Sequence, residues 1–453
     1  MDMPPVVSDR ALNRALLQRQ WLLEKVDATA ENAVDHLIGL QAQLGDPPYY
    51  QLWSRLREFS PQDLSSLLLE RKVVRIVTMR GTIHLVRAAD CFPLRDLTQV
   101  IMDREVASGS RKQVVEQVNP TLIAREGQRI LRGGPRSSVE IGERLAQRWP
   151  AFRPNHLVSV LRNVLPLVQT PPRGVWGQGG ALTYAHAAQW LGMKAQAVAD
   201  PQGTIRRYLR AFGPATVLDY QKWCGLSKQR EHFERLRPQL ITYTDAVGKE
   251  LFDIPNAPVP AEDMEVPLIK IIGPFDNLVL SHARRDRIMD QRAWERLATP
   301  NGQFPGMFLR DGMLAGVWFI DRKNTAATIR FELFHNLSTY ERDLLEHEGE
   351  ELLRFAAPDS QQRHVTFVPD GSLSGPGPYS HRHSTPWVRP SASVLVRANP
   401  TTLRPLIPVT VDPISSGWAR PGKSKTPSSV CRMAWVGVFP TVQPLALMWE
   451  TLE

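Results

Sequence analysis

The sequence contains only three cysteines in 453 residues, Cys91, Cys224 and Cys431. They form no Cys-x-x-Cys pair and have no close histidine partner, so the sequence supports neither a disulfide framework nor a zinc site. It also lacks any apolar run of about 18 residues, the length that a membrane span needs. We therefore expect a protein that needs no structural disulfide or metal and has no membrane partner.

Several common functional signatures are absent as well. The amino terminus has no basic stretch followed by an apolar block and a small-residue cleavage site, so a cytoplasmic protein is expected. No zincin, P-loop, Gly-x-Ser-x-Gly or dinucleotide motif occurs, and "GQGG" at residues 177–180 lacks the strand and the spacing of a phosphate cradle. The common hydrolase and nucleotide chemistries therefore have no support, and no cofactor is indicated.

The charge of the chain is positive but unevenly distributed. The formal net charge is +9 and the pI about 9.6, which favours a polyanionic partner. Residues 371–453 hold 8 Lys and Arg against 3 Asp and Glu, and so carry +5 of this charge. They also hold 12 prolines and show no helical or alternating period. We expect residues 369–453 to be an irregular tail, disordered or non-native in character, so that any nucleic-acid contact depends on local patches elsewhere.

A repeated order of elements precedes this tail. Apolar residues recur at helical spacing over residues 8–24, 29–43 and 61–70, and the β-branched runs around Arg80-Gly81 then predict a hairpin. Three helices followed by a hairpin is the order of a winged helix. The order recurs over residues 119–190 and 203–254, where "FGPATVLDYQKWCGL" has the Gly-Pro turn and glycine stop of a helix-turn-helix.

The sequence therefore predicts a mainly α protein with small β wings (α+β). Residues 265–355 add strand-like runs, a hairpin near Asp311-Gly312 and an acidic amphipathic helix to the third module. The predicted modules are three tandem winged helices at residues 8–115, 116–200 and 201–368, followed by the tail.

Two amides, Gln41 and Gln43, stand where an apolar face should continue. If residues 36–44 are helical, Gln41 lies among leucines, and a buried amide without a partner costs about 1–3 kcal/mol. Either the amide bonds a neighbouring backbone group, or both amides hold a water against a reacting atom that already has a good leaving group. Side chains two apart on a helix diverge by about 200°, so the second interpretation needs the helix to end at "GDPP".

Arginines near the first hairpin and in "SHARRDRI" suit phosphate contacts. The alternatives are an ordinary charged wing around a core Trp53 and a solvated charged loop. The candidate DNA-binding residues are Arg55, Arg80, Thr82, His84, Arg284, Arg285 and Arg287.

Several motifs occur together in order over residues 8–368: "GLQAQ", "PPYYQLWSRL", "MRGTIHLV", "WGQGGALTYAHAAQWLG", "YLRAFGPATVLDYQKWCGL" and "PFDNLVLSHARRDRI". The chain resembles the AlkZ-like family of winged-helix DNA glycosylases. The resemblance implies a C-shaped protein whose three winged helices form a channel for double-stranded DNA. It also implies that the family's Gln-x-Gln motif, here Gln41 and Gln43, carries out catalysis. A related branch of the family has Gln-x-Asp instead, so Gln43 assigns the chain to the Gln-x-Gln branch.

The implied reaction is removal of N7-alkylated purines from DNA, including bulky adducts and, in some members, interstrand crosslinks. Such a purine is cationic, so its glycosidic bond breaks toward an oxocarbenium-like sugar with little need for a proton. Two oriented amides could then place a water at C1′ and stabilise the transition state. A bulky adduct cannot enter a tight base-flipping pocket, so a shallow site is expected, probed by the hairpin near 81 or the one near 311.

We therefore expect a monomeric, monofunctional DNA glycosylase, located with the nucleoid in the cytoplasm. Its role would be base excision repair or self-resistance to DNA-alkylating natural products, on DNA carrying alkylated purines. The alternatives are a winged-helix transcriptional regulator and a paralogue that binds DNA without catalysis.

Overall fold

The computed structural model describes residues 4–193, 199–258, 261–297 and 303–368. The predicted tail at 369–453 lies outside these residues. No helix in the described ranges is long and apolar enough to cross a membrane.

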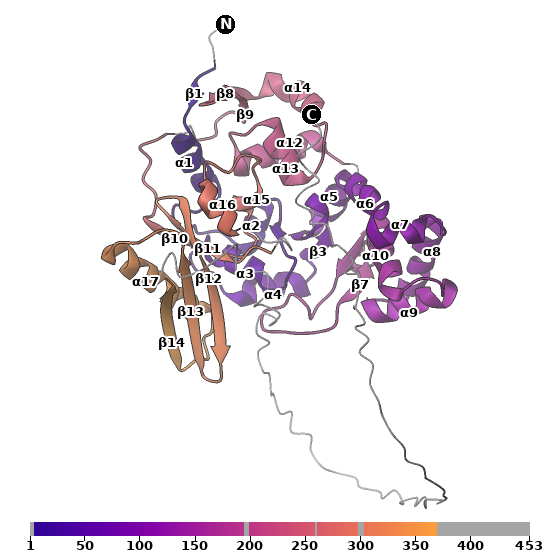
Figure 1. Ribbon diagram of the computed structural model, residues 1–453. Coiled ribbons are helices and arrows are strands. Elements are labelled where there is room, and N and C mark those ends of the chain that lie inside the picture. Colours follow the sequence, from indigo (N-terminus) through magenta and orange to yellow (C-terminus); the bar gives the residue numbers. More distant parts are fainter. Residues whose placement is uncertain (1–3, 194–198, 259–260, 298–302, 369–453) are drawn as a thin grey trace, which may run out of the picture. The chain divides into compact units, whose positions relative to one another are not determined.

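An order of three helices and a hairpin occurs three times, and in the first two repeats a short strand follows the first helix (Figure 1). The first repeat contains α2 (Ala30–His36), β2 (Leu40–Gln41), α3 (Pro47–Trp53), α4 (Pro61–Leu69), β3 (Val73–Val77) and β4 (Ile83–Arg87). The second contains α8 (Pro120–Leu131), β5 (Arg136–Ser137), α9 (Ser138–Arg148), α10 (Pro154–Val164), β6 (Leu167–Gln169) and β7 (Thr183–His186). The third contains α12 (Pro201–Phe212), α13 (Val217–Cys224), α14 (Arg230–Leu236), β8 (Ile241–Asp245) and β9 (Glu250–Asp253).

The short strand of each repeat pairs with the last strand of the same repeat. β2 pairs antiparallel with β4 and β5 with β7, while in the third repeat the single residue Ala215 bridges Phe252. The sequence predicted the helices and the hairpins but not this strand, because two residues carry no period. The strand matters, since in the first repeat it contains Gln41.

Other elements connect and extend the repeats. They are β1 (Val6–Val7), α1 (Asp9–Arg19), η1 (Met79–Gly81), η2 (Ala88–Asp90), α5 (Cys91–Leu97), α6 (Gln99–Val106), α7 (Gly109–Val115), α11 (Ala187–Leu191) and η3 (Arg237–Gln239). Towards the carboxyl end follow β10 (Ile269–Ile272), α15 (Asn277–Leu280), α16 (Gln291–Leu297), β11 (Gly306–Arg310), β12 (Met313–Lys323), β13 (Ala326–Leu333), α17 (Thr339–Ala356) and β14 (Gln362–Val368).

The expectation of a mainly α protein with small wings is wrong in one respect. Strands β10 to β14 form a five-stranded sheet in sequence order, along which α17 packs (Figure 1). The hairpins of the first two repeats also merge, because β3 pairs with β6, into a six-stranded sheet of order β2-β4-β3-β6-β7-β5. The described chain is therefore a mixed α/β protein.

Local sequence explains where the helices begin and end. At the start of α4, the side chains of Ser60 and Asp63 form a capping box. Pro61 occupies the first helical position, where its lack of an amide proton leaves no donor unpaired. At α13, Thr216 and Asp219 form the same motif, and the helix ends where Gly225 adopts a φ of +83°.

The predicted helix over 29–43 ends early. α2 stops at His36, and Ile38 and Gly39 turn the chain with φ of +56° and +98°. A Cβ on Gly39 would lie 2.8 Å from Val86 and 2.9 Å from the Leu85 carbonyl oxygen, so only glycine allows this approach to β4. The apolar residues that suggested a helix instead fill a buried strand, which is also rich in apolar side chains.

The hairpin predicted near Asp311-Gly312 forms between β11 and β12, and its turn contacts α1. Arg14 Nη2 lies 2.5 Å from Asp311 Oδ1, and Asn13 Nδ2 donates to the Gly312 carbonyl at 2.9 Å. This turn is therefore held by α1, while the Asp311 side chain remains 50% exposed. The exposed turn of the same sheet joins β12 to β13, where Asn324 has a φ of +52°.

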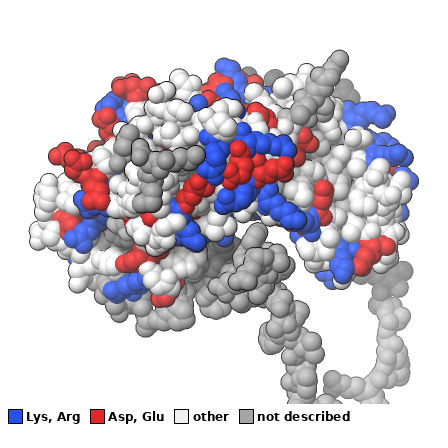
Figure 2. Space-filling model, turned by 90° about the horizontal axis from the view of Figure 1, so that it is seen from above, with Lys and Arg blue, Asp and Glu red and all other residues white. Residues whose placement is uncertain are grey.

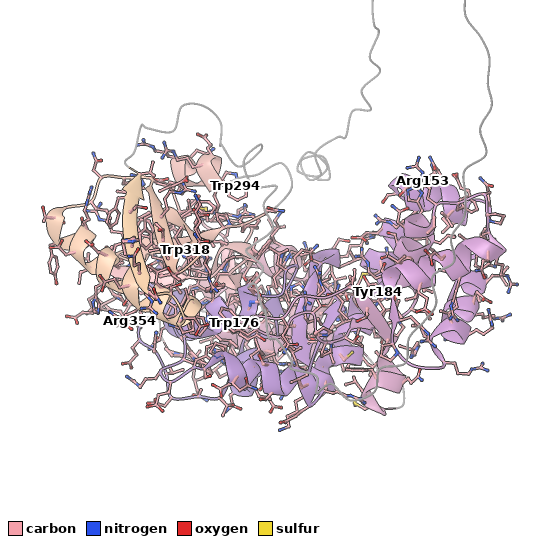
Figure 3. All side chains as sticks on the ribbon, turned by 90° about the horizontal axis from the view of Figure 1, so that it is seen from below. Arg153, Trp176, Tyr184, Trp294, Trp318 and Arg354 are labelled. Carbon is pink, nitrogen blue, oxygen red and sulfur yellow. The ribbon has the colours of Figure 1, made fainter. Side chains whose placement is uncertain are left out.

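An aromatic cluster connects the first repeat to the five-stranded sheet. The Tyr50 ring on α3 meets Trp176 at 5.6 Å and Trp318 of β12 at 5.4 Å between ring centroids. Figure 3 labels both tryptophans, which come from segments more than a hundred residues apart. The cluster fixes α3, and with it the segment that carries the two glutamines, against the rest of the fold.

Candidate active site

Gln41 lies in β2 beside the first hairpin, and Gln43 follows two residues later in the bend that leads to α3. Gln41 pairs with His84 across β2 and β4, and the next residue continues the pairing, since the Ala42 amide donates to the Ile83 carbonyl at 2.8 Å. Both amides therefore lie beside the same hairpin, in chain that follows the end of α2 at His36. Gln41 is 6% exposed and Gln43 is exposed.

The hairpin holds both amides by their oxygens. Arg80 Nη2 donates to Gln41 Oε1 at 2.8 Å, and the Ile83 backbone amide donates to Gln43 Oε1 at 3.0 Å. Each NH2 group is consequently turned away from its donor. The two amides are thus fixed in orientation, which an exposed glutamine on a free surface would not be.

Arg80 and His84 form a small network behind Gln41. Arg80 also donates to the Trp223 carbonyl and lies 3.2 Å from His84 Nε2, while His84 Nδ1 lies 3.1 Å from the Thr82 carbonyl. Because that carbonyl can only accept, Nδ1 carries the proton and Nε2 accepts from Arg80. Burial, aided by the charge of Arg80, lowers the pKa of His84 to about 3, so the ring is neutral.

The wing residues that were predicted to bind DNA make contacts within the protein. His84 is 1% exposed and Arg80 is directed at Gln41 and Trp223, with burial lowering its pKa to about 10, so it keeps its charge. The Thr82 hydroxyl donates to the Met79 carbonyl at 3.2 Å. The wing thus orients Gln41, while Arg80 and Thr82 at its tip remain partly exposed.

The third repeat supports the wing from the other side. Gly225 ends α13 directly against Arg80, where a Cβ would lie 2.8 Å from Arg80 Cα. Any side chain at this position would have to displace backbone. The orientation of Gln41 therefore depends on contacts from two repeats.

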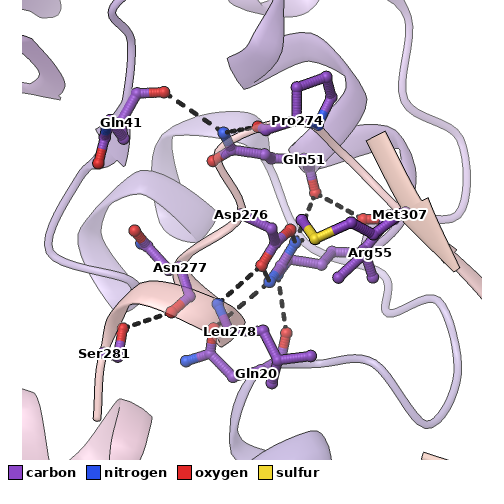
Figure 4. A network of polar contacts seen from close by, with 12 residues as sticks. Gln20, Gln41, Gln51, Arg55, Pro274, Asp276, Asn277, Leu278, Ser281 and Met307 are labelled. Carbon is purple, nitrogen blue, oxygen red and sulfur yellow. Dashed lines mark hydrogen bonds and ion pairs between the residues drawn. The ribbon is translucent and has the colours of Figure 1, made fainter. Parts of the chain in front are cut away.

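Beneath Gln41, a polar network joins α3 to the segment before α15 (Figure 4). Gln51 Nε2 donates to the Gln41 carbonyl at 3.3 Å and to the Pro274 carbonyl at 2.8 Å. Arg55 forms a two-pronged ion pair with Asp276 at 2.7 and 2.8 Å, with both side chains 0% exposed. Arg55 is therefore part of the core, and its predicted contact with DNA is wrong.

The three arginines of "SHARRDRI" have different environments. Arg284 contacts the carboxylates of Asp9, Asp245 and Asp286 at 2.9 to 3.3 Å, so its charge is balanced. Arg287 is 5% exposed and donates to the Pro214 carbonyl at 3.1 Å, which excludes it as a DNA contact.

Arg285 keeps an open charge near the glutamines. Its guanidinium stacks on Trp294 at 4.0 Å, and its pKa is lowered by desolvation. The pKa of Lys222 on α13 is lowered by burial and further by the charges of Arg285 and Arg80. Lys222 thus lies within electrostatic range of Arg285 and of Arg80, and Arg80 bonds Gln41. The sequence analysis missed Lys222, although its place in the predicted helix-turn-helix was a usable signal.

The face of the molecule seen from above carries charges of both signs. Figure 2 shows Lys and Arg interspersed with Asp and Glu over the surface seen from above. In the part of the chain that the structure describes, no group of three or more His, Cys, Asp or Glu could hold a metal ion. The chemistry available at this site is therefore that of oriented amides beside a local cluster of cations.

Comparison with known proteins identifies the family. A sequence model of the family described as "DNA glycosylase AlkZ-like" matches residues 34–355, which include both glutamines. The chain belongs to the AlkZ-like DNA glycosylase family. The resemblance deduced from the motifs is confirmed.

A relative and a solved structure extend this result. The AlkZ-like chain is 26% identical over 326 residues to the "Interstrand DNA cross-link repair glycosylase" of Streptomyces sahachiroi, covering 67% of this chain and 85% of the relative. The solved structure of Streptomyces sahachiroi DNA glycosylase AlkZ matches with a TM-score of 0.67 at 21% identity, over 80% of this chain and 100% of that one. The AlkZ fold is therefore shared.

Proposed function

We propose that this chain is a monofunctional DNA glycosylase that hydrolyses the N-glycosidic bond of N7-alkylated purines in double-stranded DNA. Bulky adducts are included, and so are interstrand crosslinks, on which the Streptomyces relative acts by its name. The single observation that carries the proposal is that one hairpin fixes the amide oxygens of both Gln41 and Gln43, by bonds from Arg80 and from the Ile83 backbone.

Gln43 is the amide that meets the damaged nucleotide, because it is exposed whereas Gln41 is buried. Its Oε1 accepts one bond from Ile83 and retains a second lone pair, which can accept a hydrogen bond from a water and aim that water at C1′. Gln41 completes the fixed dipoles around the developing positive charge. The purine leaves as a neutral base, so no proton donor is required.

Lys222 and Arg285 are proposed as phosphate contacts in place of Arg55 and Arg287. Both carry charge close to Gln41, and a cation there would hold the backbone of the damaged strand. We also propose that the three repeats are winged-helix modules with boundaries at 8–115, 116–200 and 201–368, which together line a channel for duplex DNA.

The test is single-turnover base release from duplex DNA carrying 7-methylguanine. Gln43→Ala should lower the rate about 100- to 1000-fold while DNA binding is kept, as for the loss of one oriented group in other enzymes. Gln62→Ala, at an exposed glutamine on α4, is the matched control and should be fully active. Equal release by wild type and Gln43→Ala would remove the catalytic assignment.

The alternatives predict different results. A transcriptional regulator would bind one sequence tightly and release no base, whereas a lesion enzyme should show little sequence preference on undamaged DNA. A paralogue without catalysis would bind alkylated DNA and release nothing. Mass spectrometry of the bases released from DNA treated with a panel of alkylating agents separates these cases and names the adduct.

A further inference from the structure

Arg75 lies at the centre of the six-stranded sheet and reaches the glutamine segment. Its backbone pairs with Leu85 of β4 on one side and with Gln169 of β6 on the other. Its side chain is 1% exposed, and Nη2 donates to the Ala42 carbonyl at 2.8 Å and to the Leu44 carbonyl at 3.2 Å. These two carbonyls flank Gln43 on either side.

The burial of the Arg75 guanidinium is not expected to stabilise the folded state. Arg75 makes no ion pair within 4 Å of a described carboxylate, and its Nε and Nη1 are buried without hydrogen-bond partners. Desolvation, followed by the like charge of Arg173, lowers its pKa to about 10. A buried cation with unmade hydrogen bonds is unfavourable, in contrast to Arg55, whose three nitrogens all have acceptors.

A loop from the second repeat holds the guanidinium in place. Gly174 has a φ of +94°, and a Cβ there would lie 2.8 Å from Arg75 Cδ. The Tyr49 hydroxyl donates to the Gly174 carbonyl at 2.8 Å, and a Cβ on Gly45 would lie 3.3 Å from Gly174 Cα. Arg75 is therefore enclosed between this loop and the segment after Gln43.

We propose that Arg75 is the positioning residue of Gln43: it fixes the carbonyls on both sides so that the amide keeps its bond to Ile83 and faces the DNA. Arg75 does not itself touch the nucleotide. The inference rests on the proposed function of Gln43, and it explains why a charge is kept at a position where it lowers stability.

The experiment compares Arg75→Met with Arg95→Met. Arg95 is a matched control because it resembles Arg75 in its environment: it is 4% exposed, burial lowers its pKa to about 10, and its Nε has no hydrogen-bond partner. It differs in its contacts, since it bonds Gln99 and Asn163 and not the glutamine segment. Both variants should change the melting temperature similarly. Only Arg75→Met should slow single-turnover release, by about 10- to 100-fold, with the Kd for alkylated duplex unchanged within about twofold. Arg75→Lys should restore part of the rate, because an ammonium can still donate to one carbonyl.

Hydrogen exchange of backbone amides over residues 42–46 gives a readout that does not need activity. It should be faster in Arg75→Met than in Arg95→Met. If wild type releases no base, the proposed function fails while exchange still decides whether Arg75 orders this segment. Equal exchange in the two variants, or equal loss of rate, overturns the positioning role. If Arg75→Met does not fold, Gly174→Ala takes its place, with Gly134→Ala as control, since Gly134 has a φ of +110° and open space around it.

Discussion

Replacing Arg55 by methionine distinguishes a core residue from a DNA contact. The change leaves the Asp276 carboxylate 0% exposed and without its bidentate partner, and also removes bonds to the Gln20 and Gln51 carbonyls at 2.9 Å. Breaking a buried ion pair in this way costs about 3–5 kcal/mol of unfolding free energy. Asp276→Asn should cost a similar amount, and the double variant should lose about 1–3 kcal/mol less than the sum, because the two residues interact directly.

Equilibrium unfolding in urea measures these free energies, and DNA binding of the folded variants at two salt concentrations gives the second readout. Arg57→Met is the control, since Arg57 forms an exposed pair with Asp27 and its loss should cost less than about 1 kcal/mol. Neither variant should change the salt dependence of DNA binding. The reasoning is refuted if Arg55→Met unfolds like wild type but binds DNA more weakly with a shallower salt slope.

Three further predictions follow from the site. Gly225→Ala should lower the free energy of unfolding in urea more than Gly248→Ala. Both glycines have a positive φ (+83° and +79°), but only a Cβ on Gly225 would meet backbone atoms. Local strain costs about 1–3 kcal/mol. Below pH 6.5 the unfolded chain gains a proton at His84, whereas the folded chain, in which the His84 pKa is about 3, does not. The free energy of unfolding should therefore fall by about 2 kcal/mol between pH 7 and pH 5. Urea titrations at the two pH values measure this loss, which should be smaller in His84→Gln. Lys222→Gln and Arg285→Gln should each reduce the slope of log Kd against log salt by about 1, measured by fluorescence anisotropy on undamaged duplex, and an unchanged slope would remove them as phosphate contacts.

The sequence predicted the elements whose signals are local. The hairpin between β3 and β4, the glycine stop of α13 and the capping box of α4 all depend on residues next to one another in the chain. The helix over 29–43 was wrong because a buried strand and a helix face share the same apolar residues, and only Gly39 marked the difference. The order of the repeats could be read, but the joining of β3 to β6 could not, since pairing between distant strands has no local signature.

The structure brings the two predicted glutamines to one hairpin, whereas it places the predicted arginines in different environments. The pair at 41 and 43 came from an unusual local pattern together with a family resemblance. The arginines were judged by residue type alone, and no local feature separates Arg55 from a surface arginine, because its carboxylate partner lies 221 residues away. Lys222 and Arg75 were not assigned a role beside the glutamines, because they approach the glutamines only when the repeats pack together.

The pairing of β3 with β6 sets a limit on how this protein can be divided. The boundary between the first two repeats is clear in the sequence, yet a fragment that ends before residue 116 would leave β3 as an open edge. That edge would present unpaired backbone groups beside Ile76 and a strand of buried, β-branched side chains, which favours aggregation. The first repeat contains both glutamines, but we do not expect it to fold and remain monomeric as a separate fragment.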